Sequence, residues 1–171
     1  MSEGLTDYQL GNQLLNKRRY KEAIAAFLTH AADYPEDVAK AFERVAECHI
    51  RLNNDRKAAE SYYRKALELD PEHFNALAGL SRVLPERADE RLAVLEKAVE
   101  IQPNYLLFID LGDFYRSVRK DYSLARDCYE SAWRMNPKDK TSYQKIWALC
   151  SITGDKAESE IWSERWREHA I

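Results

Sequence analysis

Residues 105–137 read YLLFIDLGDFYRSVRKDYSLARDCYESAWRMNP, and this stretch decides the fold. Apolar and aromatic side chains recur in it at helical spacing on both sides of a short charged segment. The pattern predicts two amphipathic helices joined by a turn. Asp121 opens the second half, where a carboxylate accepts hydrogen bonds from unpaired amide groups, and Pro137 ends the unit.

Prolines mark the same boundary along the whole chain. Pro35, Pro71, Pro103 and Pro137 are separated by 36, 32 and 34 residues, a mean of 34. A period of that length is typical of stacked helix–turn–helix repeats, in which each unit buries its apolar face against its neighbours. We therefore expect ten helices, at about 5–16, 20–33, 36–52, 55–69, 72–84, 87–101, 104–118, 121–135, 138–152 and 155–169.

Capping residues recur at the predicted helix starts. Thr6 and Gln9 have the spacing of a capping box, and Asp55, Asp121 and Asp155 each follow a short turn. The pairs Asp70-Pro71 and Asn136-Pro137 predict helices with proline at the first helical position.

Composition favours a folded helical protein and gives no sign of a general anion-binding surface. Of the 171 residues, 45% are hydrophobic and 32% charged, and the five glycines and five prolines argue against a strand-rich fold. The net charge of −3 offers no general attraction to nucleic acid or anionic membranes. Without a visible secretory signal or membrane-length apolar run, and with three scattered cysteines, we expect a cytoplasmic protein.

The repeat pattern resembles the tetratricopeptide repeat (TPR) family. The fourth unit carries most of the family's motif residues: Phe108, Leu111, Gly112, Tyr115, Tyr122, Ala125, Tyr129, Ala132 and Pro137. The first unit has Leu10-Gly11, Ala23 and Phe27, and the second has Ala59, Tyr63 and Ala66. The resemblance implies an all-α, right-handed superhelical α-solenoid. It implies one domain over 1–171, with five units at about 4–37, 38–72, 73–104, 105–138 and 139–171.

Two units depart from the motif. The third is short, because Pro85 truncates its first helix, and Arg91 stands where a small residue is expected. The fifth has Ile146-Trp147 in place of Leu-Gly. We expect a local kink at the third unit.

The family's concave face, lined by the first helix of each unit, predicts the binding site. It implies a groove for an extended or helical segment of another protein, with charged side chains setting the register. The groove residues expected here are Tyr8, Asn12, Lys40, Glu43, Glu47, Arg51, Asn75, Arg82, Ile109, Asp113 and Arg116. The alternative is that these side chains form only the solvated side of each helix.

One specialised form of this groove is not expected. Members that grip a C-terminal carboxylate use a clamp of Lys, Asn, Asn, Lys and Arg. Asn12 matches one clamp position, but the others are Tyr8, Arg44, Asn75 and Gly79. The sequence thus argues against a heat-shock co-chaperone.

A second interface is predicted near the C-terminus, where all four tryptophans fall. Trp162 and Trp166 lie on one stripe of the last predicted helix. Part of that stripe must cover the preceding helix, and the remainder is a candidate docking or homodimer surface.

Motifs for catalysis are missing from the sequence. It has no glycine-rich phosphate loop, Gly-x-Ser-x-Gly or His-Glu-x-x-His, and its histidines are scattered. We expect no enzyme activity, no metal and no cofactor. Short basic clusters such as Lys17-Arg18-Arg19 leave nucleic-acid binding as a weak third option, and we expect none. The expected function is a protein-binding adaptor, scaffold or chaperone-like module. The alternative is a structural subunit that oligomerises or docks through the C-terminal aromatic residues.

Overall fold

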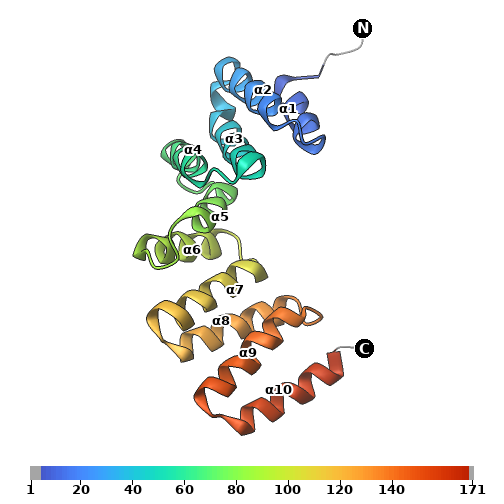
Figure 1. The fold of residues 1–171 in the computed structure, drawn as a ribbon, viewed down its shortest axis with the longest axis vertical. Coiled ribbons are helices and arrows are strands. Elements are labelled where there is room, and N and C mark those ends of the chain that lie inside the picture. The colour runs from blue at the N-terminus through green and yellow to red at the C-terminus, as the bar shows by residue number, and fades with distance from the viewer. Residues whose placement is uncertain (1–4, 170–171) are drawn as a thin grey trace. The chain divides into compact units, whose positions relative to one another are not determined.

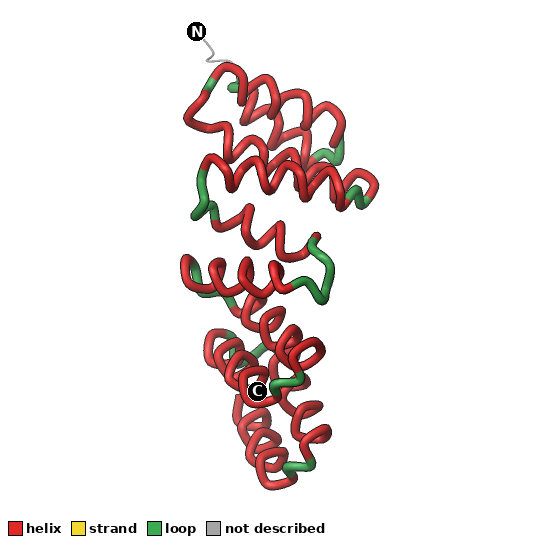
Figure 2. The backbone as a smooth tube through the Cα atoms, turned by 90° about the vertical axis from the view of Figure 1, so that its left-hand side faces the viewer, coloured by secondary structure: helices red, strands yellow, loops and turns green. Residues whose placement is uncertain are grey.

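The computed structural model describes residues 5–169, and within them the chain is a series of ten α-helices with no strand (Figure 1). In chain order the helices are α1 (Asp7–Asn16), α2 (Tyr20–Asp33), α3 (Val38–Asn53), α4 (Arg56–Leu69), α5 (Phe74–Val83), α6 (Asp89–Ile101), α7 (Tyr105–Phe114), α8 (Tyr122–Met135), α9 (Lys140–Thr153) and α10 (Lys156–His169). Figure 2 shows that only short loops connect them. The predicted all-α fold of helical hairpins is confirmed.

Each predicted helix corresponds to one observed helix, and the ends differ by a few residues. A 3-10 turn, Pro35–Asp37, precedes α3, so the α-helix itself begins at Val38. The predicted helix 104–118 ends as an α-helix at Phe114 and continues as one π-helical turn, Tyr115–Arg119.

Most of the predicted caps are present. The Thr6 hydroxyl accepts the Gln9 amide hydrogen, and the Gln9 side chain accepts that of Thr6. The carboxylates of Asp55, Asp121 and Asp155 each accept a backbone N–H from the first turn of the following helix. These bonds satisfy amide groups that would otherwise lack a partner at a helix start.

The predicted role of two prolines was wrong. Pro71 and Pro137 lie in turns before α5 and α9, and those helices begin three residues later, at Phe74 and Lys140. In each turn the residue before proline accepts an N–H from three residues ahead, as in a β-turn with proline at its second position. Asp139 therefore caps α9 in place of Asn136.

Residue contacts divide the chain into two compact units, 1–85 and 86–171. Unit 1 contains α1–α5 and unit 2 contains α6–α10. The division falls inside the third repeat at Pro85, where the sequence predicted a truncated helix. Leu84, just before this proline, has the extended backbone that proline favours in its predecessor, and α5 ends at Val83. The single domain over 1–171 and its right-handed superhelix stay predictions.

Glycines let aromatic rings approach neighbouring helices closely in both units. A Cβ on Gly11 would lie 2.7 Å from the Phe27 ring, and one on Gly112 would lie 2.5 Å from the Tyr129 ring. In each of these pairs the ring comes from the second helix of the same repeat. Gly79 differs, because the ring against it is Tyr63 of the preceding repeat, and its Cβ would lie 2.2 Å from that ring. Tyr63 thus joins α4 to α5 across a repeat boundary.

Candidate functional site

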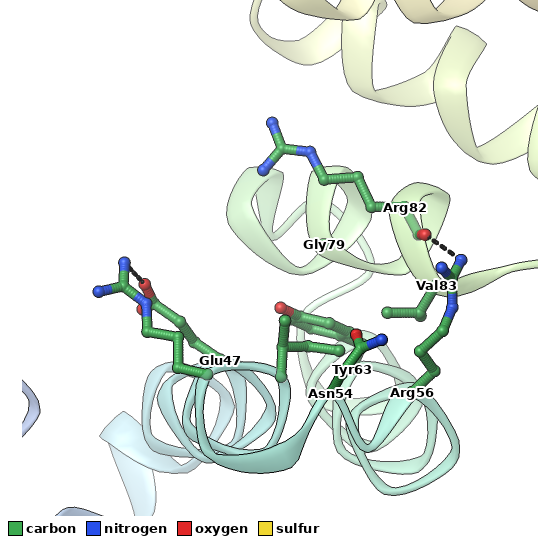
Figure 3. Close-up of a pocket in the computed structure, with 9 residues that line it drawn as sticks. Glu47, Asn54, Arg56, Tyr63, Gly79, Arg82 and Val83 are labelled. Atoms are coloured by element: carbon green, nitrogen blue, oxygen red, sulfur yellow. Dashed lines mark hydrogen bonds and ion pairs between the residues drawn. The ribbon is translucent and has the colours of Figure 1, made fainter. Parts of the chain in front are cut away.

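A cavity of about 310 Å³ lies in unit 1 between α3, α4 and α5 (Figure 3). It is lined by Glu47, Ile50, Arg51, Asn54, Arg56, Tyr63, Gly79, Arg82 and Val83. Glu47, Arg51 and Arg82 belong to the predicted groove, and the structure brings these three together. The volume is at the small end of the roughly 300–1,000 Å³ typical of ligand pockets.

Positive charge dominates the lining, and two of its three guanidinium groups have internal partners. The Glu47 carboxylate pairs with Arg51 on one oxygen and with Arg44, at 2.8 Å, on the other. Arg56 donates to the carbonyl oxygen of Arg82 near the end of α5, drawn as a dashed line in Figure 3. That bond satisfies a carbonyl left unpaired by the end of the helix.

Arg82 has no carboxylate partner within residues 5–169, and its side chain is exposed. In Figure 3 it extends across the helix at Gly79, and no dashed line reaches its guanidinium group. When a ligand displaces water from this guanidinium group, no ion pair within the described residues offsets the loss of hydration. An incoming anion is the chemical group that would offset it.

Tyr63 supplies a second polar group. The residue is only 6% exposed, and its hydroxyl has no hydrogen-bond partner in the described part of the chain. Burial, with the nearby Glu43 and Glu47 charges, raises the pKa of Tyr63 to about 12, so the hydroxyl is a protonated donor at neutral pH. Because the residue lines the cavity and its hydroxyl has no partner within residues 5–169, the hydroxyl is a candidate contact for a ligand.

The other predicted groove residues of unit 1 have mainly internal roles. The Tyr8 ring packs edge-on against Phe27, with centroids 5.4 Å apart, and Asn12 donates to the Tyr8 carbonyl oxygen at 3.0 Å. Lys40 donates to Asp37 at 2.7 Å. Asn75 is exposed on α5. Asn75 therefore stands closest to the predicted role of an open contact residue.

Two predicted groove residues are buried, and this corrects their expected place on an open face. Glu43 is 7% exposed and Ile109 is 6% exposed. Glu43 lies on α3, which packs against α2, α4 and α5, while Ile109 lies on α7, which packs against α6 and α8. Helices with neighbours on several sides bury more than one stripe. Burial raises the pKa of Glu43 to about 7, against the opposing effect of Arg44.

In unit 2 the predicted residues Asp113 and Arg116 belong to a closed polar network. Asp113 accepts from Lys145 at 2.6 Å and from the Tyr129 hydroxyl at 2.8 Å, and Arg116 lies 3.4 Å away. Arg116 also donates to the Tyr129 oxygen at 3.2 Å. The network joins α7, α8 and α9, so these charges hold the helices together before any ligand arrives.

The predicted C-terminal interface residues are largely covered. Trp162 is 2% exposed and packs edge-on against Trp133, with centroids 5.1 Å apart. Trp166 is half-buried and stacks on Tyr143 at 5.0 Å. Large exposed apolar side chains on α9 and α10 are instead Trp147, Ile152 and Ile161. The two tryptophans of the predicted stripe therefore face the packed side of α10.

The remaining chemistry of the described residues is consistent with packing. Within 5–169 no group of three His, Cys, Asp or Glu side chains could hold a metal ion. Burial raises the pKa of Cys48 to about 12 and of Cys128 to about 11, which keeps both thiols protonated and weakly nucleophilic. None of the helices in this part of the chain is long and apolar enough to cross a membrane.

Sequence reasoning missed several lining residues, among them Ile50, Arg56 and Tyr63. Arg56 meets the carbonyl of a residue 26 positions away, and Tyr63 was counted only as a core motif residue. Gly79 could have indicated the role of Tyr63. It lies in the first helix of the third repeat, and the second helix of that repeat has no aromatic residue at the motif position to pack against it. Lys145 was also missed, since it meets Asp113 across 32 residues.

Known proteins share this architecture. Residues 39–73 match the family model of the tetratricopeptide repeat. Over 114 residues, or 64% of the chain, the sequence is 32% identical to Anaphase-promoting complex subunit 3 of Schizosaccharomyces pombe. The chain spans only 17% of the length of that relative.

Solved structures of MamA have a similar fold. A double mutant of MamA RS-1 gives a TM-score of 0.81 at 18% identity, covering 95% of this chain and 91% of that one. MamA from Desulfovibrio magneticus RS-1, from residue 41 to its end, gives 0.78 at 18% identity, covering 95% and 90%. At that identity the likeness concerns the fold alone. The matched repeat at residues 39–73 and the helical hairpins make the chain similar to tetratricopeptide repeat proteins.

Proposed function

We propose that this chain is an adaptor or scaffold that holds a segment of another protein against the first helices of its repeats, with the α3–α5 cavity as the main contact. Tetratricopeptide arrays present extended surfaces of this kind, and their stacked repeats provide rigid positions for side chains. The observation that carries the proposal is the cavity itself, where the exposed Arg82 side chain and the hydroxyl of the mostly buried Tyr63 have no carboxylate or hydrogen-bond partner within residues 5–169.

The proposed mechanism is binding without catalysis. Arg51 and Arg82 stand exposed beside the cavity, while Ile50 and Val83 offer apolar contact. Charged groups at the edge set specificity and the association rate, and the enclosed groups set the lifetime of the complex. We propose a cytoplasmic location and protein partners, with no nucleic acid.

The alternative is a subunit that oligomerises or docks through Trp162 and Trp166. It is the weaker proposal because Trp162 is buried and Trp166 is stacked on Tyr143. An interface on α9 and α10 would have to use exposed residues such as Trp147 and Ile161.

Affinity capture from an extract of the source cells tests the proposal. The bait is the full chain, compared with a variant carrying Arg51→Glu and Arg82→Glu. The matched control carries Lys21→Glu and Lys57→Glu, which reverse two exposed charges on α2 and α4. Circular dichroism first verifies that all three are equally helical.

We expect a partner that binds the native chain and the control but not the cavity variant. A partner retained equally by all three baits would contradict the proposed site. Self-capture alone, together with a light-scattering mass of a dimer that Trp147→Ala and Ile161→Ala abolish, would favour the alternative.

A further inference from the structure

We infer that the α3–α5 cavity accepts an acidic side chain, aspartate or glutamate, from the bound segment, and that this carboxylate sits between Arg82 and the Tyr63 hydroxyl. The inference rests on the proposed function and names the chemistry of its partner. It concerns unit 1 only, since every lining residue lies within residues 1–85.

Charge complementarity is the first argument. Three guanidinium groups and one carboxylate line the cavity. The Glu47 charge is already matched twice, by Arg44 at 2.8 Å and by Arg51. Arg56 is directed to a backbone carbonyl, which carries no net charge to balance it. A basic or neutral occupant would leave this excess unbalanced, whereas a carboxylate would form a charge-assisted hydrogen bond with Arg82.

The Tyr63 hydroxyl points independently to the same kind of ligand. Tyr63 is 6% exposed, lines the cavity, and has no acceptor for its O–H within the described residues. The O–H is therefore an available donor at the cavity, and a carboxylate is the strongest acceptor among side chains. A lysine or arginine of a partner could not accept this hydrogen. The O–H therefore favours the same ligand as Arg82.

The backbone at Gly79 leaves the hydroxyl accessible. A Cβ at this position would lie 2.2 Å from the Tyr63 ring and 2.6 Å from its oxygen, so any other residue would displace the Tyr63 side chain. Figure 3 shows the Tyr63 ring beneath the Gly79 helix turn, with Arg82 following on the same helix. Ile50 and Val83 complete the lining with apolar surface. The preferred segment thus has an aliphatic side chain near its acidic residue.

Peptide selection with the full native chain identifies the probe. A random-peptide phage library displayed through its C-terminal end, so that no free C-terminus is presented, is panned on the chain. The tightest binder is synthesised with an amidated C-terminus. It is then compared by fluorescence anisotropy with its counterpart in which each Glu or Asp is replaced by Gln or Asn.

We expect selected peptides rich in Asp or Glu, and an amide counterpart that binds at least about tenfold more weakly. Arg82→Gln should weaken the acidic peptide about tenfold or more, and Tyr63→Phe about fivefold, while neither changes the affinity of the amide peptide. Lys21→Gln removes one exposed positive charge outside the cavity and should leave the affinity unchanged.

The remaining outcomes overturn the inference in distinguishable ways. Neutral or basic peptides that bind independently of Arg82 would refute the acidic ligand while leaving the proposed function intact. An acidic peptide whose affinity is unchanged by both Arg82→Gln and Tyr63→Phe would place its carboxylate outside the cavity and refute the inference. Selection of no peptide would count against both the inference and a peptide-binding groove.

Discussion

Because of Glu43, we expect unit 1 to become less stable as the pH rises from about 4.5 to 8. The Glu43 carboxyl group is 7% exposed, and burial raises its pKa from 4.5 to about 7. Between these values the folded chain binds a proton that the unfolded chain does not bind. The contribution of Glu43 is therefore fully present below about pH 4.5 and is lost as the pH rises through 7.

The magnitude follows from the shift. A change of one pKa unit corresponds to about 1.4 kcal/mol, so raising the pH from 4.5 to 8 should cost about 3 kcal/mol of unfolding free energy through this group. Glu43→Gln replaces the carboxyl with a neutral group of the same shape. At pH 8 the variant should be about 3 kcal/mol more stable than the native chain, and at pH 4.5 the two should be nearly equal.

Urea denaturation followed by circular dichroism at several pH values measures this difference. Glu68→Gln, which changes an exposed carboxyl on α4, is the matched control and should follow the native pH profile. Native and Glu43→Gln chains with parallel profiles between pH 4.5 and 8 would refute the argument that burial controls this carboxyl.

Three further predictions concern unit 2, where all four tryptophans report unfolding by fluorescence. Gly112→Ala places a Cβ 2.5 Å from the ring of Tyr129 and should cost about 1–3 kcal/mol; an unchanged urea midpoint would contradict this contact. Trp162→Ala should cost about 3–5 kcal/mol because the ring is buried, whereas Trp147→Ala should change stability by less than about 0.5 kcal/mol, and equal effects would contradict the assigned burial. Asp121→Ala should cost about 1 kcal/mol through loss of the α8 cap, Asp121→Asn should retain most of it, and equal losses would argue against the capping bond.

Local signals account for what could be predicted. The helices and most of their starts depend on side-chain spacing within a few residues and on caps such as Asp55. Local sequence patterns are therefore enough to locate them. The proline turns were misjudged by three residues because Asp-Pro can open a helix or a β-turn, and the choice depends on how the repeats stack. Asp139, not Asn136, was the capping residue.

The site required contacts that no local pattern contains. Arg82 and Glu47 were identified from their motif positions, but the Tyr63 ring crosses from the second repeat to Gly79 of the third. The bond of Lys145 to Asp113 likewise joins residues that are 32 positions apart in the sequence. Helical periodicity placed Trp162 on a stripe, but which side of that stripe is covered depends on its contact with Trp133.

The most direct test of the account is nuclear magnetic resonance of the full chain during titration with its captured partner segment. The arginine side-chain N–H signals, assigned with Arg82→Gln, report on the cavity, and the indole N–H signals report on the four tryptophans of unit 2. We expect the Arg82 signal to shift in a saturable way while the Trp147 signal remains in place. Saturable shifts of Trp147 with an unaffected Arg82 would move the binding site to α9 and α10 and contradict binding at the α3–α5 cavity.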